Sequence, residues 1–388
     1  MSVLREWLVV GAGFTGATVA RRLAEDFDVK VLLIDQRPHL AGNAYDSREP
    51  TGELVHRYGP HIFHTNSPAV FGFLSRFTSW RSYQHRVGAM IDGTLVPLPF
   101  GFGAIDTLLP ERAERLKNAL SETYGIDARV PIGRLATSSD RQLQELAEFI
   151  LENVFRNYSR RQWGRELDEL DASVAARVPV AISYDERYFA DSFQGIPSEG
   201  YTELFRRMLD HPNISVQLST KYETLAPTQK ALPTVHTGAI DDFHDFEFGM
   251  LPYRSMDFEY VHFDRPFAQP FPTINLPSSP SHIRSTEYAW LTGEANGSSV
   301  IVRESPRPHE WGKTDPHYPI PMRSTKDIAD KYFNAARRLR GKLWFAGRLG
   351  DYQYYNMDQA CARGHALVDK ELRQVLPHAR TLDTRLEI

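Results

Sequence analysis

The chain opens with an apolar stretch at residues 7–10 that is followed at once by the pattern Gly-x-Gly-x-x-Gly. Such a short apolar run is typical of a buried parallel strand. From Phe14 onward, small and apolar residues recur at helical spacing, which predicts a helix. A second apolar run at 31–34 ends in an acid, Asp35. This order of strand, glycine turn, helix and strand predicts the start of a Rossmann-type domain.

The three glycines and the acid have separate roles in this pattern. Gly11 allows the tight turn, Gly13 lets backbone amides approach a pyrophosphate, and Gly16 permits close packing of the helix. The N-terminus of the helix adds N–H groups and partial positive charge that suit phosphates. Asp35 lies where a ribose hydroxyl needs an acceptor. We therefore expect a dinucleotide to bind here.

Residues 100–165 change to a helical pattern. In one part of this segment, apolar side chains form a single stripe between acidic positions. The stripe consists of Leu143, Leu146, Ile150 and Val154. Ser139 or Asp140 is a suitable N-cap for this helix. The segment predicts a helical domain that is inserted into the chain.

The segments 76–99, 166–197 and 241–321 differ in composition from the Rossmann-like and helical segments. They contain short pieces rich in Phe, Tyr, Val and Thr, which proline clusters at 270–272 and 277–280 interrupt. This pattern is typical of a mixed or antiparallel β-sheet, and we expect it to form a substrate domain.

The end of the chain returns to the first pattern. A last apolar strand ends near Phe345 and opens onto Gly347, and a helix begins near Asn356. This strand and helix offer a second set of backbone amides, which suits the flavin half of FAD and which NAD enzymes rarely need. The small, glycine-containing loop at 37–45 favours the same cofactor.

These segments together predict the fold class. It is α/β, with a discontinuous Rossmann-like FAD-binding domain at 1–75, 198–240 and 322–388, an inserted helical domain, and a mixed or antiparallel β-sheet domain. A length of 388 residues is sufficient for two or three domains.

Composition narrows the class of protein further. The single cysteine, Cys361, excludes an internal disulfide. The net charge is -4 and charges of both signs are interspersed, so we expect no nucleic-acid partner. No signal segment and no window near the length of a membrane span is found, so we expect a cytoplasmic protein with no membrane partner.

The sequence segments Tyr58 to Thr65 and Arg161 to Gly164 resemble the corresponding segments of the bacterial UDP-galactopyranose mutases. The resemblance continues through most of the chain, at 11–16, 42–45, 170–180, 184–191, 253–255, 284–287 and 345–358. It implies an isomerase that interconverts UDP-galactopyranose and UDP-galactofuranose. The family reaction passes through a covalent adduct between the sugar C1 and N5 of reduced FAD, without net redox change.

The resemblance also implies the site residues. Arg177 and Arg284 match two arginines that bind the diphosphate, and we assign them and His64 to catalysis. Trp163 matches a tryptophan on a mobile loop that closes over the substrate, with Gly164 as its hinge. The other residues expected at the substrate are His85, Phe155, Tyr184, Tyr188, Asn275, Tyr318 and Tyr354. Those expected at the cofactor are Gly11, Gly13, Phe14, Thr15, Gly16, Asp35, Gln36, Gly42, Asn43, His61, Ile62, Gly347, Arg348, Tyr355, Asn356 and Met357.

Some positions depart from the family pattern or suggest other chemistry. His61 and His64 have metal-ligand character, but no third ligand accompanies them, so we expect no metal. His236 and His244 stand where the family commonly has aromatic residues, and the helix around Cys361 is unusual. These departures leave open whether this chain is fully active.

Two alternatives remain open at this point. Besides the mutase, the sequence is compatible with a flavin oxidoreductase of the amine-oxidase type, which shares the FAD motifs, and with a non-catalytic flavoprotein that binds UDP-sugars. For the mutase, the resemblance further implies an external reductant for FAD and a homodimer or higher homo-oligomer.

Overall fold

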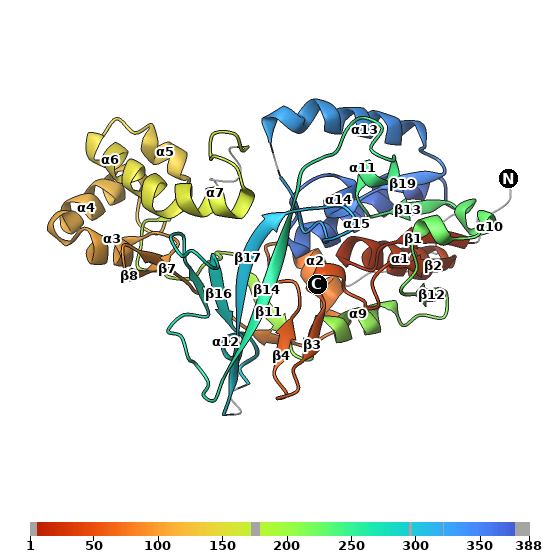
Figure 1. Ribbon diagram of the computed structural model, residues 1–388, viewed down its shortest axis with the longest axis horizontal. Coiled ribbons are helices and arrows are strands. Elements are labelled where there is room, and N and C mark those ends of the chain that lie inside the picture. Colours follow the sequence, from red (N-terminus) through yellow and green to blue (C-terminus); the bar gives the residue numbers. More distant parts are fainter. Residues whose placement is uncertain (1–5, 172–178, 295–296, 321, 377–388) are drawn as a thin grey trace, which may run out of the picture.

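The computed structural model describes residues 6–171, 179–294, 297–320 and 322–376 (Figure 1). Its first sheet is parallel and has the strand order β12-β2-β1-β13-β19. The strands are β12 (Ile214–Gln217), β2 (Lys30–Ile34), β1 (Glu6–Val10), β13 (Thr234–His236) and β19 (Leu343–Phe345). Strands from the beginning, middle and end of the chain therefore build one sheet, as the sequence predicts.

Helices cover both faces of this sheet. Alternate residues of β1 point to opposite faces, so Trp7 and Val9 pack under α1 (Phe14–Phe27) while Leu8 packs on the other side. The helices α15 (Met357–Lys370) and α9 (Tyr201–Leu209) share the core of α1, and α13 (Lys326–Arg338) covers β19 on the opposite face (Figure 1). The result is the layered arrangement of a doubly wound domain.

A second sheet of seven strands occupies the middle of the molecule. Its order is β18-β14-β17-β16-β15-β7-β8, and every neighbouring pair is antiparallel except β15 with β7. The strands are β18 (Tyr318–Pro319), β14 (Tyr253–Phe263), β17 (Ser299–Pro308), β16 (Arg284–Glu287), β15 (Thr273–Asn275), β7 (Val87–Ile91) and β8 (Thr94–Leu98). This is the mixed sheet that the sequence predicts.

A helical lobe lies beyond β7 and β8, at the opposite end from the parallel sheet (Figure 1). It contains α3 (Phe102–Leu108), α4 (Ala113–Tyr124), α5 (Ile132–Ala136), α6 (Arg141–Ile150) and α7 (Asn157–Trp163). The Asp140 carboxylate accepts the Gln142 N–H at the start of α6, 2.8 Å away, and the predicted apolar stripe is buried. A π-helical segment, η3 (Leu151–Arg156), joins α6 to α7, and the sequence does not predict it.

Smaller elements connect these parts. Two further sheets consist of β5 (Phe63–Thr65), β11 (Phe193–Pro197) and β6 (Trp80–Ser82), and of β3 (Asp46–Arg48) with β4 (Leu54–His56). The pair β9 (Arg129–Val130) and β10 (Val180–Ala181) closes the helical lobe. The short helices are α2 (Pro68–Ser75), α10 (Pro227–Lys230), α11 (Ile240–Phe243), α12 (Tyr288–Thr292), α14 (Gly347–Gly350), η1 (Gly42–Ala44), η2 (Pro110–Arg112), η4 (Tyr222–Thr224), η5 (Arg323–Thr325) and η6 (Leu372–Gln374).

The predicted fold class is confirmed by this architecture, and we keep the division into three domains as a proposal. In the ranges described above, no helix has both the length and the apolar character needed to cross a membrane.

Asp46 on β3 anchors α9 to the rest of the first domain. α9 has no side-chain cap of its own, but the buried Asp46 carboxylate accepts the N–H groups of Tyr201 (2.6 Å) and Thr202 (2.9 Å). We predict that Asp46→Ala lowers the free energy of unfolding by about 3 kcal/mol, because two buried donors lose their acceptor. Asp46→Asn keeps one acceptor oxygen and should lose less. Urea denaturation checks both values, and equal stability of all three proteins would contradict this account.

Candidate functional site

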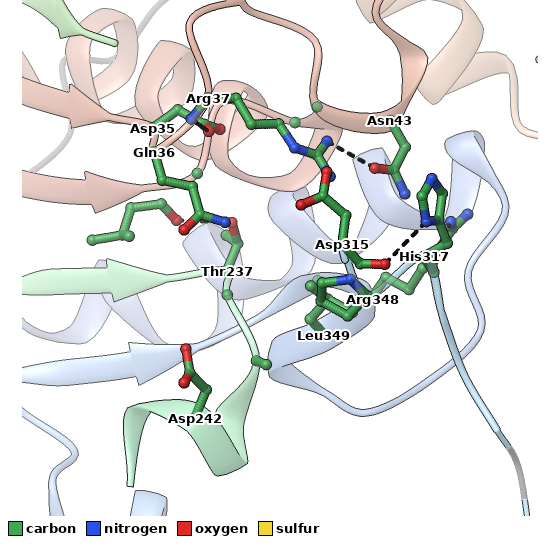
Figure 2. Close-up of a pocket in the computed structure, with 18 of the residues that line it drawn as sticks. Asp35, Gln36, Arg37, Asn43, Thr237, Asp242, Asp315, His317, Arg348 and Leu349 are labelled. Carbon is green, nitrogen blue, oxygen red and sulfur yellow. Dashed lines mark hydrogen bonds and ion pairs between the residues drawn. The ribbon is translucent and has the colours of Figure 1, made fainter. Parts of the chain in front are cut away.

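The carboxyl ends of the parallel strands open onto a cavity of about 1420 Å³ (Figure 2). Its walls come from the residues that follow β1, β2, β13 and β19, from the beginnings of α1 and α15, and from β14, the end of β17 and residues 311–317. Open α/β sheets bind their ligands at this edge. The volume and the position therefore suit an elongated dinucleotide.

The glycine turn between β1 and α1 forms one wall. Gly11 has a φ of +106°, and a Cβ atom there would lie 2.0 Å from Thr237 Oγ1. A Cβ at Gly16 would lie 1.9 Å from the Gly11 carbonyl oxygen, so only glycine permits this approach of helix and strand. α1 begins at Phe14 without a side-chain cap, which leaves N–H groups of its first turn to face the cavity. This arrangement fits a bound pyrophosphate.

The Asp35 carboxylate lies at the end of β2 and is held in place by the backbone. Its Oδ2 accepts the Ala12 N–H at 2.7 Å, and its Oδ1 accepts the Arg37 N–H at 2.9 Å. Each carboxylate oxygen has a second lone pair, so both can still accept a ribose hydroxyl. The geometry fits the predicted role.

Arg348 places a positive charge at the other end of the cavity. Its guanidinium donates to the carbonyl oxygens of Tyr355 (2.6 Å) and His317 (3.2 Å), and lies about 5 Å from the ring centres of Tyr318 and Tyr354. Within the described ranges no carboxylate pairs with this arginine. Its charge is therefore available to an anionic group in the cavity.

Most residues that the sequence predicts for the cofactor line this cavity. They are Gly11, Gly13, Phe14, Thr15, Gly16, Asp35, Gln36, Gly42, Asn43, His61, Gly347, Arg348, Asn356 and Met357. Ile62 instead packs in a hydrophobic cluster, and the Tyr355 hydroxyl donates to Asp351 at 3.2 Å. The sequence did not identify Arg37, Tyr58, Thr237, Asp315 or His317 as lining residues. Arg37 lies in the small loop at 37–45 and Tyr58 in the segment that resembles the family, whereas the other three come from distant loops and have no local signal.

The histidines beside the cavity are neutral. Burial lowers the pKa of both His56 and His61 to about 3. The backbone N–H of His61 donates to His56 Nδ1 at 2.9 Å. The ring Nδ1 of His61 lies 2.8 Å from the Gly59 carbonyl oxygen, so Nδ1 of His61 carries the ring proton. No group of three potential metal ligands occurs among the described residues.

A cluster of aromatic rings adjoins the Arg348 end of the cavity. Tyr318 and Tyr354 stack with ring centres 5.2 Å apart, and Trp163 meets them edge-on at 6.3 and 5.9 Å. Trp163 is the last residue of α7 and is buried. The structure thus brings together three predicted substrate residues from distant parts of the chain.

A buried arginine that the sequence did not identify holds the end of α7. Arg254 on β14 donates to the carbonyl oxygens of Gln162 (2.8 Å) and Arg161 (3.0 Å). Gly164, the helix C-cap, has a φ of +66°, and a Cβ there would lie 2.9 Å from Arg254 Nη1. Burial lowers the pKa of Arg254 to about 10, and the guanidinium stays charged at neutral pH. This contact fixes the position of Trp163.

Arg284 lies between two cross-strand partners in the large sheet. The register places it opposite Asn275 on β15 and Glu304 on β17. Its Nε donates to Asn275 Oδ1 at 3.3 Å, its Nη1 lies 3.4 Å from Glu304 Oε2, and Nη2 donates to the Tyr158 hydroxyl. Burial opposes the charge, but Glu304 and Tyr158 raise the pKa of Arg284 above its ordinary value. The strand register therefore holds the Arg284 cation beside Asn275, Glu304 and Tyr158.

The predicted histidines His64 and His85 lie on either side of Phe189. The His64 ring stacks on Phe189 with centres 3.7 Å apart, and its Nδ1 lies 2.9 Å from Asp191 Oδ2. His85 stacks on Phe189 at 6.2 Å, and its carbonyl accepts the Tyr188 N–H at 2.8 Å. Burial lowers the pKa of His85 to about 3.

Three other predicted residues are placed differently. Phe155 is buried in the core of the helical lobe, where Tyr188 packs against the same cluster. Tyr184 is 60% exposed, and its hydroxyl contacts Asp106 and Lys117 on the surface of the lobe, away from the other substrate residues. Arg177 lies outside the described residues.

The positions that depart from the family pattern are accommodated by packing. His236 lines the cavity, and burial lowers its pKa to about 4, so the neutral ring packs among Tyr222, Phe243 and Phe345. Cys361 is fully buried, and its sulfur accepts the Thr18 hydroxyl at 3.4 Å. Neither position disrupts the cavity.

The parallel sheet, the glycine turn and a cavity lined by both Asp35 and Arg348 define a dinucleotide-binding protein. Residues 9–77 match the family model of the NAD(P)-binding Rossmann-like domain, and residues 153–354 match that of UDP-galactopyranose mutase. The chain belongs to the UDP-galactopyranose mutase family. It is accordingly a flavin-dependent isomerase.

Known relatives extend over nearly the whole chain. A dTDP-fucopyranose mutase from Escherichia coli is 37% identical over 90% of this chain and 94% of its own length. A UDP-galactopyranose mutase from Mycoplasma genitalium is 34% identical over 91% of each chain. A crystal structure of reduced UDP-galactopyranose mutase superimposes with a TM-score of 0.74 over 95% of this chain and 94% of that one, at 15% identity. This last match shows the fold alone.

The buried histidines predict how stability depends on pH. Burial lowers the pKa to about 3 or 4 for His56, His61, His85, His236, His317 and His365. The unfolded chain takes up a proton at each near pH 6.5, whereas the folded protein does not, so stability present above pH 6.5 is lost as the pH falls toward 4.

Each of these histidines should contribute about 1 kcal/mol to the loss between pH 7 and pH 5.5. We predict that His85→Asn reduces the loss by this amount, as measured by urea denaturation at the two pH values. An unchanged loss in the variant would show that His85 is not held neutral by the fold.

Proposed function

We propose that this protein interconverts the pyranose and furanose forms of a nucleoside-diphosphate sugar, with UDP-galactose as the sugar nucleotide and reduced FAD as the cofactor. The observation that carries the proposal is the position of Arg284, a half-buried cation held by Asn275, Glu304 and the Tyr158 hydroxyl. A dianionic diphosphate that leaves the sugar and returns to it needs such a fixed charge. The mutase relatives support the same reaction.

Residues of the cavity, among them Asp35 and Arg348, would hold FAD, and its reduced form would supply a nucleophilic nitrogen for the anomeric carbon as the bond to the diphosphate breaks, without net redox change. The chain's own residues position the reactants and stabilise charge. Arg284 binds the diphosphate through its planar fork, and the resemblance adds Arg177 on the same group. Arg348 favours negative charge at the flavin end of the cavity. The neutral His61 lines that cavity without adding a competing charge.

The aromatic residues complete the proposed substrate site. Tyr318 and Tyr354 supply hydroxyl donors to the phosphates without adding charge, and Trp163 covers the sugar from the end of α7. The resemblance implies a mobile loop at Trp163, whereas Trp163 here ends α7 and Arg254 holds this end of the helix, so we propose that the tryptophan is in place before substrate arrives. We keep His64, His85, Tyr188, Asn275 and Phe155 in the site on the strength of the resemblance. We do not keep Tyr184, because its hydroxyl is engaged on the outer surface of the helical lobe.

A second candidate substrate is a dTDP-linked 6-deoxy sugar. The Escherichia coli dTDP-fucopyranose mutase is 37% identical to this chain, a slightly higher value than that of the UDP-galactopyranose mutases compared with it. The two substrates differ at the base, at the ribose 2′-hydroxyl and at C6 of the hexose. Assays of UDP-galactose and dTDP-fucose side by side discriminate between them through the ratio of kcat/KM values.

The oxidoreductase and non-catalytic alternatives have less support. An amine oxidase binds its substrate in an apolar tunnel, whereas the site here holds the ion pair of Arg284 and Glu304. We further propose a cytoplasmic homodimer or higher homo-oligomer that receives electrons from an external reductant, as the family resemblance implies.

We predict that Arg284→Ala lowers kcat/KM at least 100-fold in the dithionite-reduced enzyme, about 2.7 kcal/mol of transition-state stabilisation. The measurement is the conversion of UDP-galactofuranose to UDP-galactopyranose, followed by chromatography. Arg303→Ala is the matched control, because Arg303 lies on the adjacent strand but faces solvent and pairs with Glu259. Full activity of the Arg284 variant, or no activity in the folded, flavin-containing wild type, would contradict the proposal.

A further inference from the structure

An ion pair crosses the cofactor cavity between two walls that come from different sheets. Arg37 follows β2 of the parallel sheet, and Asp315 lies between β17 and β18 of the large sheet. Arg37 Nη2 lies 3.0 Å from Asp315 Oδ2, and both residues line the cavity. Figure 2 shows the two side chains facing each other between the two walls.

Both partners are held in position by other contacts. Arg37 Nη1 donates to Asn43 Oδ1 at 2.9 Å, and the guanidinium lies 4.4 Å from the centre of the Tyr58 ring. The Asp315 carbonyl accepts the Ser255 hydroxyl at 2.8 Å and lies 3.1 Å from His317 Nδ1. The Arg37 side chain is only 16% exposed. Much of the entropy that an exposed ion pair loses on forming is therefore already lost in the fold.

We propose that Arg37 and Asp315 form a clasp across the cavity that slows the release of the bound dinucleotide. Arg37 belongs to the wall that carries Asp35 and Asn43, and Asp315 belongs to the opposite wall. A ligand that lies along the cavity cannot separate from the first wall without moving past this contact. The clasp rests on the proposal that FAD occupies the cavity. It adds Arg37 and Asp315 as residues that retain the cofactor by pairing with each other.

A second ion pair in the same cavity provides a matched control. Arg307 Nη1 lies 3.2 Å from Asp257 Oδ1, and both residues also line the cavity. They belong to β17 and β14, which are adjacent strands of one sheet, so this pair does not join opposite walls. Removal of Asp257 changes the charge of the cavity in the same way as removal of Asp315, but it leaves the clasp intact.

The test is the rate at which FAD dissociates from the purified holoenzyme, followed by the rise in flavin fluorescence after dilution. We expect Asp315→Asn and Arg37→Met each to raise the rate about tenfold, and the double variant to be no faster than the faster single variant. High salt should accelerate release from the wild type and have little effect on the variants, since the Asp315 side chain is 41% exposed and salt screens its attraction to Arg37. Asp257→Asn should release FAD at the wild-type rate.

Several results would overturn the clasp. Asp315→Asn with the wild-type rate would do so, as would equal acceleration by Asp257→Asn, which would indicate a general charge effect. Acceleration by Arg37→Met alone would indicate a direct contact of Arg37 with FAD. A folded wild type that takes up no FAD would overturn the cofactor proposal together with the clasp, whereas the other results leave the cofactor proposal standing.

Discussion

The close approach of α1 to β1 is the constraint on which the rest of the structure depends. At Gly16 the backbone leaves no room for a side chain, because a Cβ would lie 1.9 Å from the Gly11 carbonyl. This contact directs the N-terminus of α1 at the carboxyl edge of the sheet, where Asp35 and Arg348 also face the cavity. The N-terminus of α1, the Asp35 carboxylate and the Arg348 guanidinium therefore face the same cavity.

The histidines and arginines near the cavity differ in charge. The histidines beside the cavity are neutral because they are buried, whereas Arg348 is held by carbonyl groups and Arg284 by a buried carboxylate. Arg284 is paired with Glu304 and still stands among tyrosine hydroxyls. A flavin dinucleotide and a sugar nucleotide are both anionic, and in the proposed function Arg348 supplies a cation for the first and Arg284 a cation for the second.

The sequence predicts the parts of this account that depend on local pattern. The glycine turn, the capped helix after Asp140 and the place of Gly347 in the cavity wall follow from short sequence motifs. The π-helical turn at η3 has no such signal. The grouping of Arg284 with its neighbours depends on strand register, and the clasp joins residues 278 positions apart, so neither can be read from local pattern. Tyr184 lies in a segment that resembles the family, but its hydroxyl contacts Asp106 on the surface of the helical lobe.

The central claim is that a fold shared with oxidoreductases catalyses an isomerisation without net electron transfer. The most direct measurement is the flavin absorbance near 450 nm while the reduced enzyme converts an excess of UDP-galactofuranose without oxygen. The account predicts many turnovers for each flavin while the flavin stays reduced. Reoxidation of the flavin in step with product formation, or equal turnover by the oxidised enzyme, would contradict it.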